Sequence, residues 1–304
     1  LICELSDGEH RGYGEATANS YYNATIEQMR RDLEQLAPWL DSIGDFSPGE
    51  LWEEASERLE NSPFALCALD EAAYDLWGKQ QGQPVYRLWG LSAENIPDSN
   101  FTIGIDTIET MVAKLRETPG WPIYKIKLGT EHDLDIIRAL RNETDATFRF
   151  DANCVWNVNQ AIAYSRELAN LGVEFIEQPL PADRWDDAER LYRESALPLV
   201  ADESCIVESD VPRCAGRFHG VNIKLVKCGG LTPARRMIDE ARRLGMKTMV
   251  GCMTESTVGI SAIAQLLPLL DYVDMDGAAL LASDIAEGVR VVEGRCHYPE
   301  VSGT

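Results

Sequence analysis

The chain has 304 residues, enough for one large domain together with a smaller one. Its formal net charge of −22 argues against binding to nucleic acid or to anionic membrane surfaces, because like charges repel. No apolar run approaches the roughly 20 residues that cross a bilayer, and no signal peptide opens the chain, so we expect a cytoplasmic protein. The eight cysteines form no C-x-x-C pair, and we expect reduced, buried thiols.

The first hundred residues contain strands followed by helices. Residues 1–17 predict a β-hairpin that turns at Asp7-Gly8. Apolar residues recur at helical spacing over 25–40, 50–59 and 64–79, and a short segment follows at 85–88. Because strands and helices do not alternate here, the pattern predicts an α+β domain over residues 1–98.

From about residue 100, apolar strand candidates alternate with helical patterns. The eight candidates cover residues 101–105, 123–128, 147–152, 174–179, 197–203, 221–227, 247–253 and 272–277. Eight strands with intervening helices fit a barrel better than an open sheet, which usually has fewer strands. We therefore predict an α/β fold with a barrel over residues 99–280. The segment 281–304 ends in a weak strand, VRVVEG, and we expect it to return to the first domain.

Charged residues stand at the ends of these predicted strands. In the middle of the barrel they recur every 22 to 26 residues, about the length of one strand, one crossover helix and two loops. The ends of parallel barrel strands meet at one mouth, which is where barrels carry out chemistry. The set therefore predicts an active site. Its members are Lys125, Lys127, Asp151, Glu177, Asp202, Lys224, Asp274 and Asp276.

Three members of this set are carboxylates that each follow an apolar strand. Asp151, Glu177 and Asp202 offer hard oxygen ligands, which suit Mg²⁺. Any one of them alone would more simply be the N-cap of the next helix. Three in register, with lysines on the neighbouring strands, favour the metal site instead. Asn153, two residues beyond Asp151, is expected to support the ligands from outside the coordination sphere.

The lysines suggest proton transfer. Lys125 and Lys127 alternate onto one face of their strand, and two ammonium groups near a divalent metal lower a lysine pKa. A lysine with a lowered pKa can act as a general base. The alternative for a lone K-x-K is an edge strand protected by its charges. Lys224 points the same way as Asn222, into the mouth. The Gly229-Gly230 pair is a weak sign of phosphate binding.

The motifs KIK, DAN, EQP, ADES, NIKLVKCGG and DMD follow one another in this order, after the helix ALDEAAYDLWGKQQGQPVYRLWG. This series resembles the muconate-lactonizing subgroup of the enolase superfamily over essentially the whole chain. The resemblance implies a modified (β/α)₇β TIM-like barrel with an α+β capping domain. The family usually has a further stretch before the first strand of the cap, so we expect the capping domain of this sequence to be incomplete at its N-terminus.

The resemblance also implies a role for each charged residue. Asp151, Glu177 and Asp202 match the ligands of one Mg²⁺ per subunit. Lys127 and Lys224 match two acid/base residues on opposite faces of the substrate's α-carbon, and Lys125 matches the lysine that tunes Lys127 and contacts substrate. An α-proton beside a carboxylate is very weakly acidic, so the metal must neutralise the charge of the enediolate that forms.

The acids Asp274 and Asp276 narrow the expected substrate. The pair resembles the D-x-D of dipeptide epimerases, where an acidic pair suits a substrate ammonium group; two helix-capping acids are the alternative. We expect an isomerase that inverts the α-carbon of the C-terminal residue of an L,L-dipeptide. Tyr21 and Tyr22 of the cap loop are expected to line the specificity pocket, and Glu255 to form part of its wall.

Other functions remain open at this stage. N-acylamino-acid racemase and o-succinylbenzoate synthase share the lysine pair, but their substrates carry no ammonium group. The substrate of muconate cycloisomerase likewise offers the acidic pair no partner. Acid-sugar dehydration is disfavoured because no histidine ends a strand, and serine hydrolysis because no G-x-S-x-G is present. A binding protein that kept the fold is a further alternative. We expect the protein to form a homo-oligomer and to bind a small-molecule substrate. We expect it to bind neither nucleic acid nor a membrane.

Overall fold

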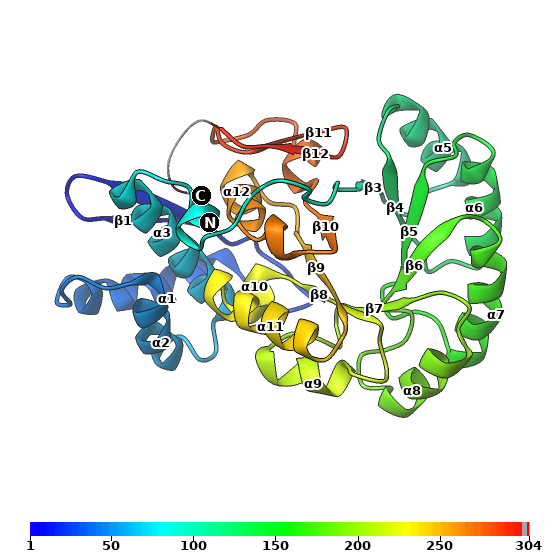
Figure 1. Ribbon diagram of the computed structural model, residues 1–304, viewed down its shortest axis with the longest axis horizontal. Helices are drawn as coiled ribbons and strands as arrows, with labels where there is room; N and C mark the ends of the chain where they lie inside the picture. The colour runs from blue at the N-terminus through cyan, green and yellow to red at the C-terminus, as the bar shows by residue number, and fades with distance from the viewer. Residues whose placement is uncertain (300–302, 304) are drawn as a thin grey trace.

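The computed structural model describes residues 1–299 and 303 (Figure 1). Its N-terminal part places a hairpin beside helices, at the left of Figure 1. Strands β1 (Ile2–Ser6) and β2 (Arg11–Glu15) pair antiparallel, as predicted. The predicted helices are α1 (Ile26–Leu40), α2 (Pro48–Arg58) and α3 (Pro63–Gln81), and the short segment at 85–88 is a helical turn, α4 (Val85–Leu88).

Helix α3 is the centre of the N-terminal part, buried along most of its length. It lies directly on β2 because two residues of that strand lack side chains. A Cβ on Gly12 would stand 2.1 Å from the carbonyl oxygen of Ala72, and one on Gly14 would stand 2.0 Å from that of Ala68. These glycines are therefore required for the close contact between hairpin and helix.

The rest of the chain forms an eight-stranded parallel barrel. Its strands lie side by side in chain order, and a bridge between Ser99 and Val273 joins the first to the last. The strands are β3 (Phe101–Ile103), β4 (Ile123–Lys127), β5 (Thr147–Asp151), β6 (Val173–Glu177), β7 (Leu199–Ala201), β8 (Gly220–Ile223), β9 (Lys247–Gly251) and β10 (Tyr272–Asp274). This confirms the α/β barrel.

Helices follow the strands, and most of them cover the outside of the barrel (Figure 1). They are α5 (Ile108–Glu117), α6 (Asp133–Arg141), α7 (Val158–Ala169), α8 (Trp185–Glu194), α9 (Val211–Cys214), α11 (Leu231–Arg243) and α12 (Thr257–Ala264), with 3₁₀ turns at Glu208–Asp210, Leu267–Leu269 and Gly277–Leu280. The single turn α10 (Leu225–Cys228) is buried against α3 instead.

Strand alternation determines which side chains enter the barrel. On β5, Phe148 and Phe150 are fully buried in the hydrophobic core, whereas Arg149 and Asp151 belong to the opposite face. Arg149 donates to the carbonyl oxygen of Val273 across the barrel, at 3.1 Å. Asp151 therefore lies two residues farther along the same interior face, at the carboxyl end of the strand, where barrels place their active sites.

All eight barrel strands end one to four residues before their predicted ends, and two of these differences bear on the site. The pattern at 221–227 predicted one strand, but β8 ends at Ile223 and Leu225–Cys228 form the single turn α10. The tertiary contacts of Lys227 explain this, because its ammonium is buried 2.5 Å from Asp202 Oδ1 and an extended backbone would carry it elsewhere. Strand β10 likewise ends at Asp274, so Asp276 lies in the loop beyond it.

The C-terminal segment contacts the N-terminal part. The weak strand predicted at 289–294 is β11 (Arg290–Val292), which pairs antiparallel with β12 (Arg295–His297). Val85 donates its backbone N–H to Gly303 at 3.2 Å. Residues 300–302 and 304 of the predicted segment lie outside the described residues. The domain boundaries near residues 98 and 280 stay predictions.

Two acids of the N-terminal part cap helices of the barrel. Asp70 of α3 accepts the backbone N–H of Thr232 at 2.9 Å, in the first turn of α11. Glu15 of β2 accepts the backbone N–H groups of Ser256 at 3.0 Å and Gly259 at 3.1 Å, at the start of α12. A negative charge at this position satisfies otherwise unpaired N–H groups and complements the helix dipole.

The position of Asp70 also decides whether Gly229-Gly230 can bind phosphate. A Cβ on Gly230 would stand 2.4 Å from Asp70 Oδ2, so this carboxylate already lies against the start of α11. The weak indication of phosphate binding at Gly229-Gly230 is therefore wrong.

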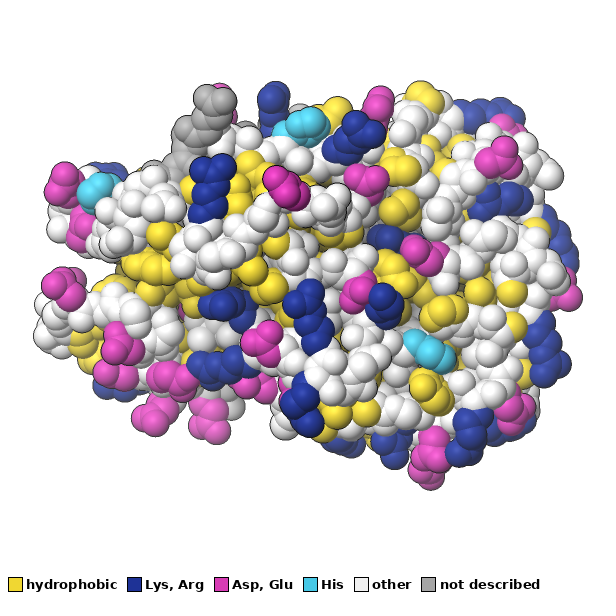
Figure 2. Space-filling view, viewed as in Figure 1, with side chains coloured by type: hydrophobic (Ala, Val, Ile, Leu, Met, Phe, Trp, Pro, Cys, Tyr) yellow, Lys and Arg dark blue, Asp and Glu magenta, His cyan; other side chains and the backbone are white. Residues whose placement is uncertain are grey.

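Basic and acidic side chains are interspersed over the face shown in Figure 2, and acidic ones gather near α2. All eight cysteines are free thiols, as expected; four are buried and four are partly exposed. No helix among residues 1–299 is long and apolar enough to cross a membrane.

Candidate active site

Three buried carboxylates meet at the mouth of the barrel. Asp151 and Glu177 are register partners at the ends of β5 and β6, and Asp202 follows β7. One oxygen from each lies within 4.8 Å of the other two, and none of the three side chains is more than 1% exposed. The sequence prediction that these acids converge is confirmed.

Neighbouring groups hold each carboxylate in place. Asp151 accepts the backbone N–H of Asn153 at 3.0 Å, so Asn153 supports the site through its backbone and not through its amide. Glu177 accepts a hydrogen bond from Asn222 Nδ2 at 2.8 Å. The Asp202 carboxylate accepts hydrogen bonds from the ammonium groups of Lys224 and Lys227, one on each oxygen.

This oxygen set fits Mg²⁺. Burial, and next the negative charge of Asp151, raise the pKa of Glu177 to about 7, so the three acids repel one another. Glu177 Oε2 is buried and accepts no hydrogen bond from the described residues, although the Lys125 ammonium lies 2.8 Å away. A small divalent cation that prefers carboxylate oxygens relieves both costs. Mg²⁺ is accordingly the cofactor that Asp151, Glu177 and Asp202 would hold.

Two lysines approach this triad from opposite walls. Lys127 Nζ at the end of β4 lies 2.5 Å from Asp151 Oδ2, and Lys224 Nζ after β8 lies 2.9 Å from Asp202 Oδ2. Strands β5, β6 and β7 separate β4 from β8, so the two lysines stand half-way round an eight-stranded barrel from each other. Both border the same cavity, of about 310 Å³.

The third lysine, Lys125, lies deeper and is 2% exposed. Its ammonium is 2.8 Å from Glu177 Oε2, 2.8 Å from Asp274 Oδ2 and 3.2 Å from Asp151 Oδ2. Burial disfavours its charge, but these three carboxylates outweigh burial and raise its pKa well above the ordinary value. With the protein's own charges alone, Lys125 is therefore an ammonium. The predicted lowering of a lysine pKa requires the divalent metal and stays a prediction. The tuning of Lys127 by Lys125 likewise stays a prediction.

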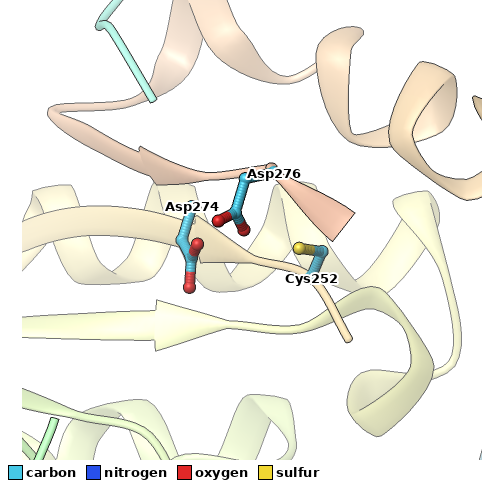
Figure 3. A group of neighbouring side chains, drawn as sticks. All are labelled: Cys252, Asp274 and Asp276. Atoms are coloured by element: carbon cyan, nitrogen blue, oxygen red, sulfur yellow. The ribbon is translucent and has the colours of Figure 1, made fainter. Parts of the chain in front are cut away.

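Asp274 and Asp276 form an acidic pair in the wall of the cavity, and the thiol of Cys252 lies beside them (Figure 3). The carboxylates of Asp274 and Asp276 and the Cys252 thiol come within 4.8 Å of one another. Burial, followed by the charge of Asp274, raises the pKa of Asp276 to about 8. Lys125 offsets the burial of Asp274 and brings its pKa down to about 2. The pair is thus an acidic subsite within reach of the lysines.

The remaining predicted pocket residues do not border this cavity, whose wall includes Thr17, Ala18, Asn19, Thr102, Cys252, Met253, Thr254 and Leu280. Glu255 is buried and accepts the backbone N–H of Met253 at 2.8 Å, so it holds the loop that forms the wall. Tyr22 packs on Phe64 with ring centroids 5.8 Å apart, and Tyr21 is 65% exposed. Burial, and next the charge of Asp202, raise the pKa of Tyr22 above its usual value.

Sequence reasoning missed three supporting residues. Asn100 donates to Asp274 Oδ1 at 2.7 Å, Gln178 accepts the backbone N–H of Asp202 at 2.9 Å, and Lys227 binds Asp202. Gln178 adopts a positive φ of 36°, directly after the ligand Glu177. Only Lys227 carried a signal, because a lysine three residues after a strand end falls back toward that end if a helical turn begins there.

Comparison with known proteins agrees with this geometry. Residues 108–304 match the family described as enolase C-terminal domain-like. The L-Ala-D/L-amino acid epimerase of Flavobacterium johnsoniae is 54% identical over 304 residues, which cover 100% of this chain and 90% of that protein. The L-Ala-D/L-Glu epimerase of Bacteroides thetaiotaomicron is 38% identical over 295 residues, 96% of this chain and 76% of that one.

The fold also matches solved structures. The dipeptide epimerase from Methylococcus capsulatus, complexed with Mg and the dipeptide L-Arg-D-Lys, superposes with a TM-score of 0.90 at 34% identity. The match covers 99% of this chain and 90% of that one.

Proposed function

The chain belongs to the enolase C-terminal domain-like family of the enolase superfamily, and from this premise we propose that it is a Mg²⁺-dependent dipeptide epimerase. The observation that carries the proposal is the position of Lys127 and Lys224 on opposite walls of one cavity, with the carboxylate triad between them. Inverting a carbon centre requires proton removal on one face and proton return on the other, which two opposed lysines supply.

In this mechanism the α-carbon of the C-terminal residue lies between the two lysines. In one direction Lys127 removes the α-proton and Lys224 returns a proton to the other face; in the reverse direction they exchange roles. Mg²⁺ held by Asp151, Glu177 and Asp202 would polarise the substrate carboxylate and so stabilise charge that develops next to the α-carbon. Burial of the site strengthens every charge interaction in it.

The acidic pair supports a dipeptide over the rival substrates. Asp274 and Asp276 are 4% and 2% exposed, so a cation that reaches them interacts in a site from which water is largely excluded. A dipeptide brings a free α-ammonium group, whereas an N-acylated amino acid and an o-succinylbenzoate precursor bring none. We propose that the pair binds this ammonium.

The test uses proton exchange. The chain is incubated with L,L-dipeptides and Mg²⁺ in D₂O, and deuterium at the α-carbon and diastereomer ratio are read by mass spectrometry and chiral chromatography. Lys127→Ala and Lys224→Ala should each abolish epimerisation, and each should leave exchange of a different diastereomer. The exposed Lys247→Ala is the control and should behave as wild type. Identical exchange patterns in both site variants would mean that only one lysine contacts the α-carbon.

A second arm tests the substrate class. The same dipeptide with its amino group acetylated should have a much lower kcat/KM, because the ammonium partner of the acidic pair is gone. If acetylation instead raises kcat/KM, the substrate is an N-acylamino acid and the dipeptide assignment fails. We further propose that the enzyme is homo-oligomeric, which sedimentation of the purified chain would test, and cytoplasmic, which fractionation of cells that express it would test.

A further inference from the structure

Gln178 joins the segments that carry the three metal ligands. Its side-chain Oε1 accepts the backbone N–H groups of Asp202 at 2.9 Å and Ser204 at 3.1 Å, beyond the end of β7. Its backbone carbonyl oxygen accepts the N–H of Cys154, beyond the end of β5, at 2.9 Å. Because Gln178 also follows Glu177 directly, this one residue is bonded to the ends of all three ligand strands.

The side-chain amide of Gln178 is buried and fully hydrogen-bonded. The residue is 0% exposed. While Oε1 accepts two backbone N–H groups, Nε2 donates to the carbonyl oxygen of Leu180 and to Ser204 Oγ, each at 2.8 Å. Turning the amide over would place donors against donors, so only one orientation satisfies every partner. Oε1 is therefore fixed against the backbone of Asp202.

The backbone of Gln178 is an independent sign that its side chain is needed. Its φ is 36°, in the left-handed region that favours glycine. Asn153 and Cys154, which follow the ligand Asp151, also have positive φ angles, of 43° and 67°. A residue other than glycine in this region costs free energy and persists only where its surroundings hold it there. Glycine would relieve that cost at position 178 but would lose the amide, so the side chain itself has a role.

The spacing of the ligands bears on which divalent cation the site binds. Mg²⁺ requires oxygens at about 2.0–2.1 Å in near-octahedral geometry, whereas Ca²⁺ takes them at about 2.3–2.6 Å in flexible geometry. A larger ion therefore fits a set of carboxylates only if they can move apart. The hydrogen bond from the Asp202 N–H to Gln178 Oε1 resists this movement, because it joins the segment of Asp202 to that of Glu177.

We propose that Gln178 is a positioning residue that gives the site its preference for Mg²⁺ over Ca²⁺. It acts through the backbone of Asp202 and through its neighbour Glu177. The inference rests on the Mg²⁺ site of the proposed function and on no choice of substrate. A merely structural residue would weaken the binding of both ions alike when replaced. A residue that fixes the spacing of the ligands instead changes the ratio of the two affinities.

The test measures Mg²⁺ and Ca²⁺ affinities of the full chain by calorimetry without substrate. Gln178→Met keeps about the same side-chain length and removes all four amide hydrogen bonds. It should lower the ratio of Mg²⁺ affinity to Ca²⁺ affinity by about tenfold. Ser204→Ala leaves both N–H bonds to Oε1 in place and should keep the ratio of wild type. The exposed Gln35→Met of α1 is the matched control and should also keep it.

Gln178→Asn covers the case in which Gln178→Met does not fold. Asparagine tolerates a positive φ, but its shorter side chain withdraws the amide from Asp202. The affinity ratio should fall in the same direction. Equal losses of affinity for both ions, or an unchanged ratio, would overturn the proposal, and so would a wild type that binds Ca²⁺ as tightly as Mg²⁺. If wild type prefers Mg²⁺ but epimerises no dipeptide, the proposed function fails by itself, and the ratio still decides the role of Gln178.

Discussion

Replacing Lys227 with methionine should destabilise the protein strongly, because its charge is buried and fully used. Lys227 is 1% exposed, and its ammonium lies 2.5 Å from Asp202 Oδ1, 2.6 Å from the Asp202 carbonyl oxygen and 3.1 Å from that of Cys205. Methionine keeps the apolar stem and removes all three donors. Breaking a buried ion pair costs about 3–5 kcal/mol. Lys224 still pairs with Asp202 Oδ2, so we expect the lower end, about 3 kcal/mol.

An exposed ion pair of nearly the same length provides the control. Lys247 Nζ lies 2.6 Å from Asp271 Oδ1, but its side chain is 58% exposed. Lys247→Met should therefore cost no more than about 1 kcal/mol. Both variants and wild type are unfolded in urea and followed by circular dichroism, first without Mg²⁺ and then with a saturating concentration.

The Mg²⁺ series separates the two roles of Lys227. Mg²⁺ stabilises the folded state in proportion to how tightly it binds, and Lys227 fixes the orientation of the ligand Asp202. Lys227→Met should accordingly gain less stability from Mg²⁺ than wild type gains, whereas Lys247→Met should gain as much. Equal losses in the two variants would refute the argument from burial, and an undiminished gain from Mg²⁺ would refute the positioning of Asp202.

Three further outcomes are expected. Excess chelator should abolish epimerisation reversibly, and Asp202→Asn should lower kcat/KM at least about a hundredfold. Asp202→Asn should also lower the free energy of unfolding, because it removes the carboxylate that pairs with the buried Lys224 and Lys227. Gly230→Ala should destabilise the protein by about 2 kcal/mol or more in urea titration, because its Cβ would meet Asp70, whereas Gly216→Ala, with open space around it, should cost only about 1 kcal/mol. Burial raises the pKa of Asp70 to about 7, from 3.8, so its ionisation opposes folding. Stability without Mg²⁺ should fall as pH rises from about 4 to 7, and Asp70→Asn should lessen that slope without removing it, because the pKa of Glu177 is raised to about 7 as well; a slope equal to that of wild type would refute the contribution of Asp70.

The metal triad was predictable because residues that recur once per strand and helix along the sequence become neighbours at the mouth of a barrel. Asp151 follows β5 and Glu177 follows β6, and their strands pair in register, so an interval of 26 residues becomes one step round the mouth. The interior face of each strand follows from alternation alone, which correctly placed Lys127 and Lys224 in the mouth. These inferences use only local pattern and the geometry shared by parallel barrels.

The supporting contacts were not predictable in this way. Asn100 meets a partner 174 residues away, and nothing in the sequence around it distinguishes it from any asparagine that begins a strand. The helical turn at Leu225–Cys228 was read as strand because its apolar residues also suit β structure, and only the burial of the Lys227 ammonium decides between them. The charge of Lys125 depends on three carboxylates from three other strands, which strand pattern alone does not bring together.

The capping of two barrel helices by Asp70 and Glu15 has a consequence for how such proteins can be recombined. Helices α11 and α12 begin with N–H groups that are satisfied from α3 and β2, so a barrel excised from this chain would carry two frayed helix starts next to the loops after β8 and β9. A cap transplanted from a relative would function here only if it brought carboxylates to the same two places. We therefore expect the loops of the substrate pocket to vary among relatives, whereas the two capping carboxylates, Asp70 and Glu15, must stay in place.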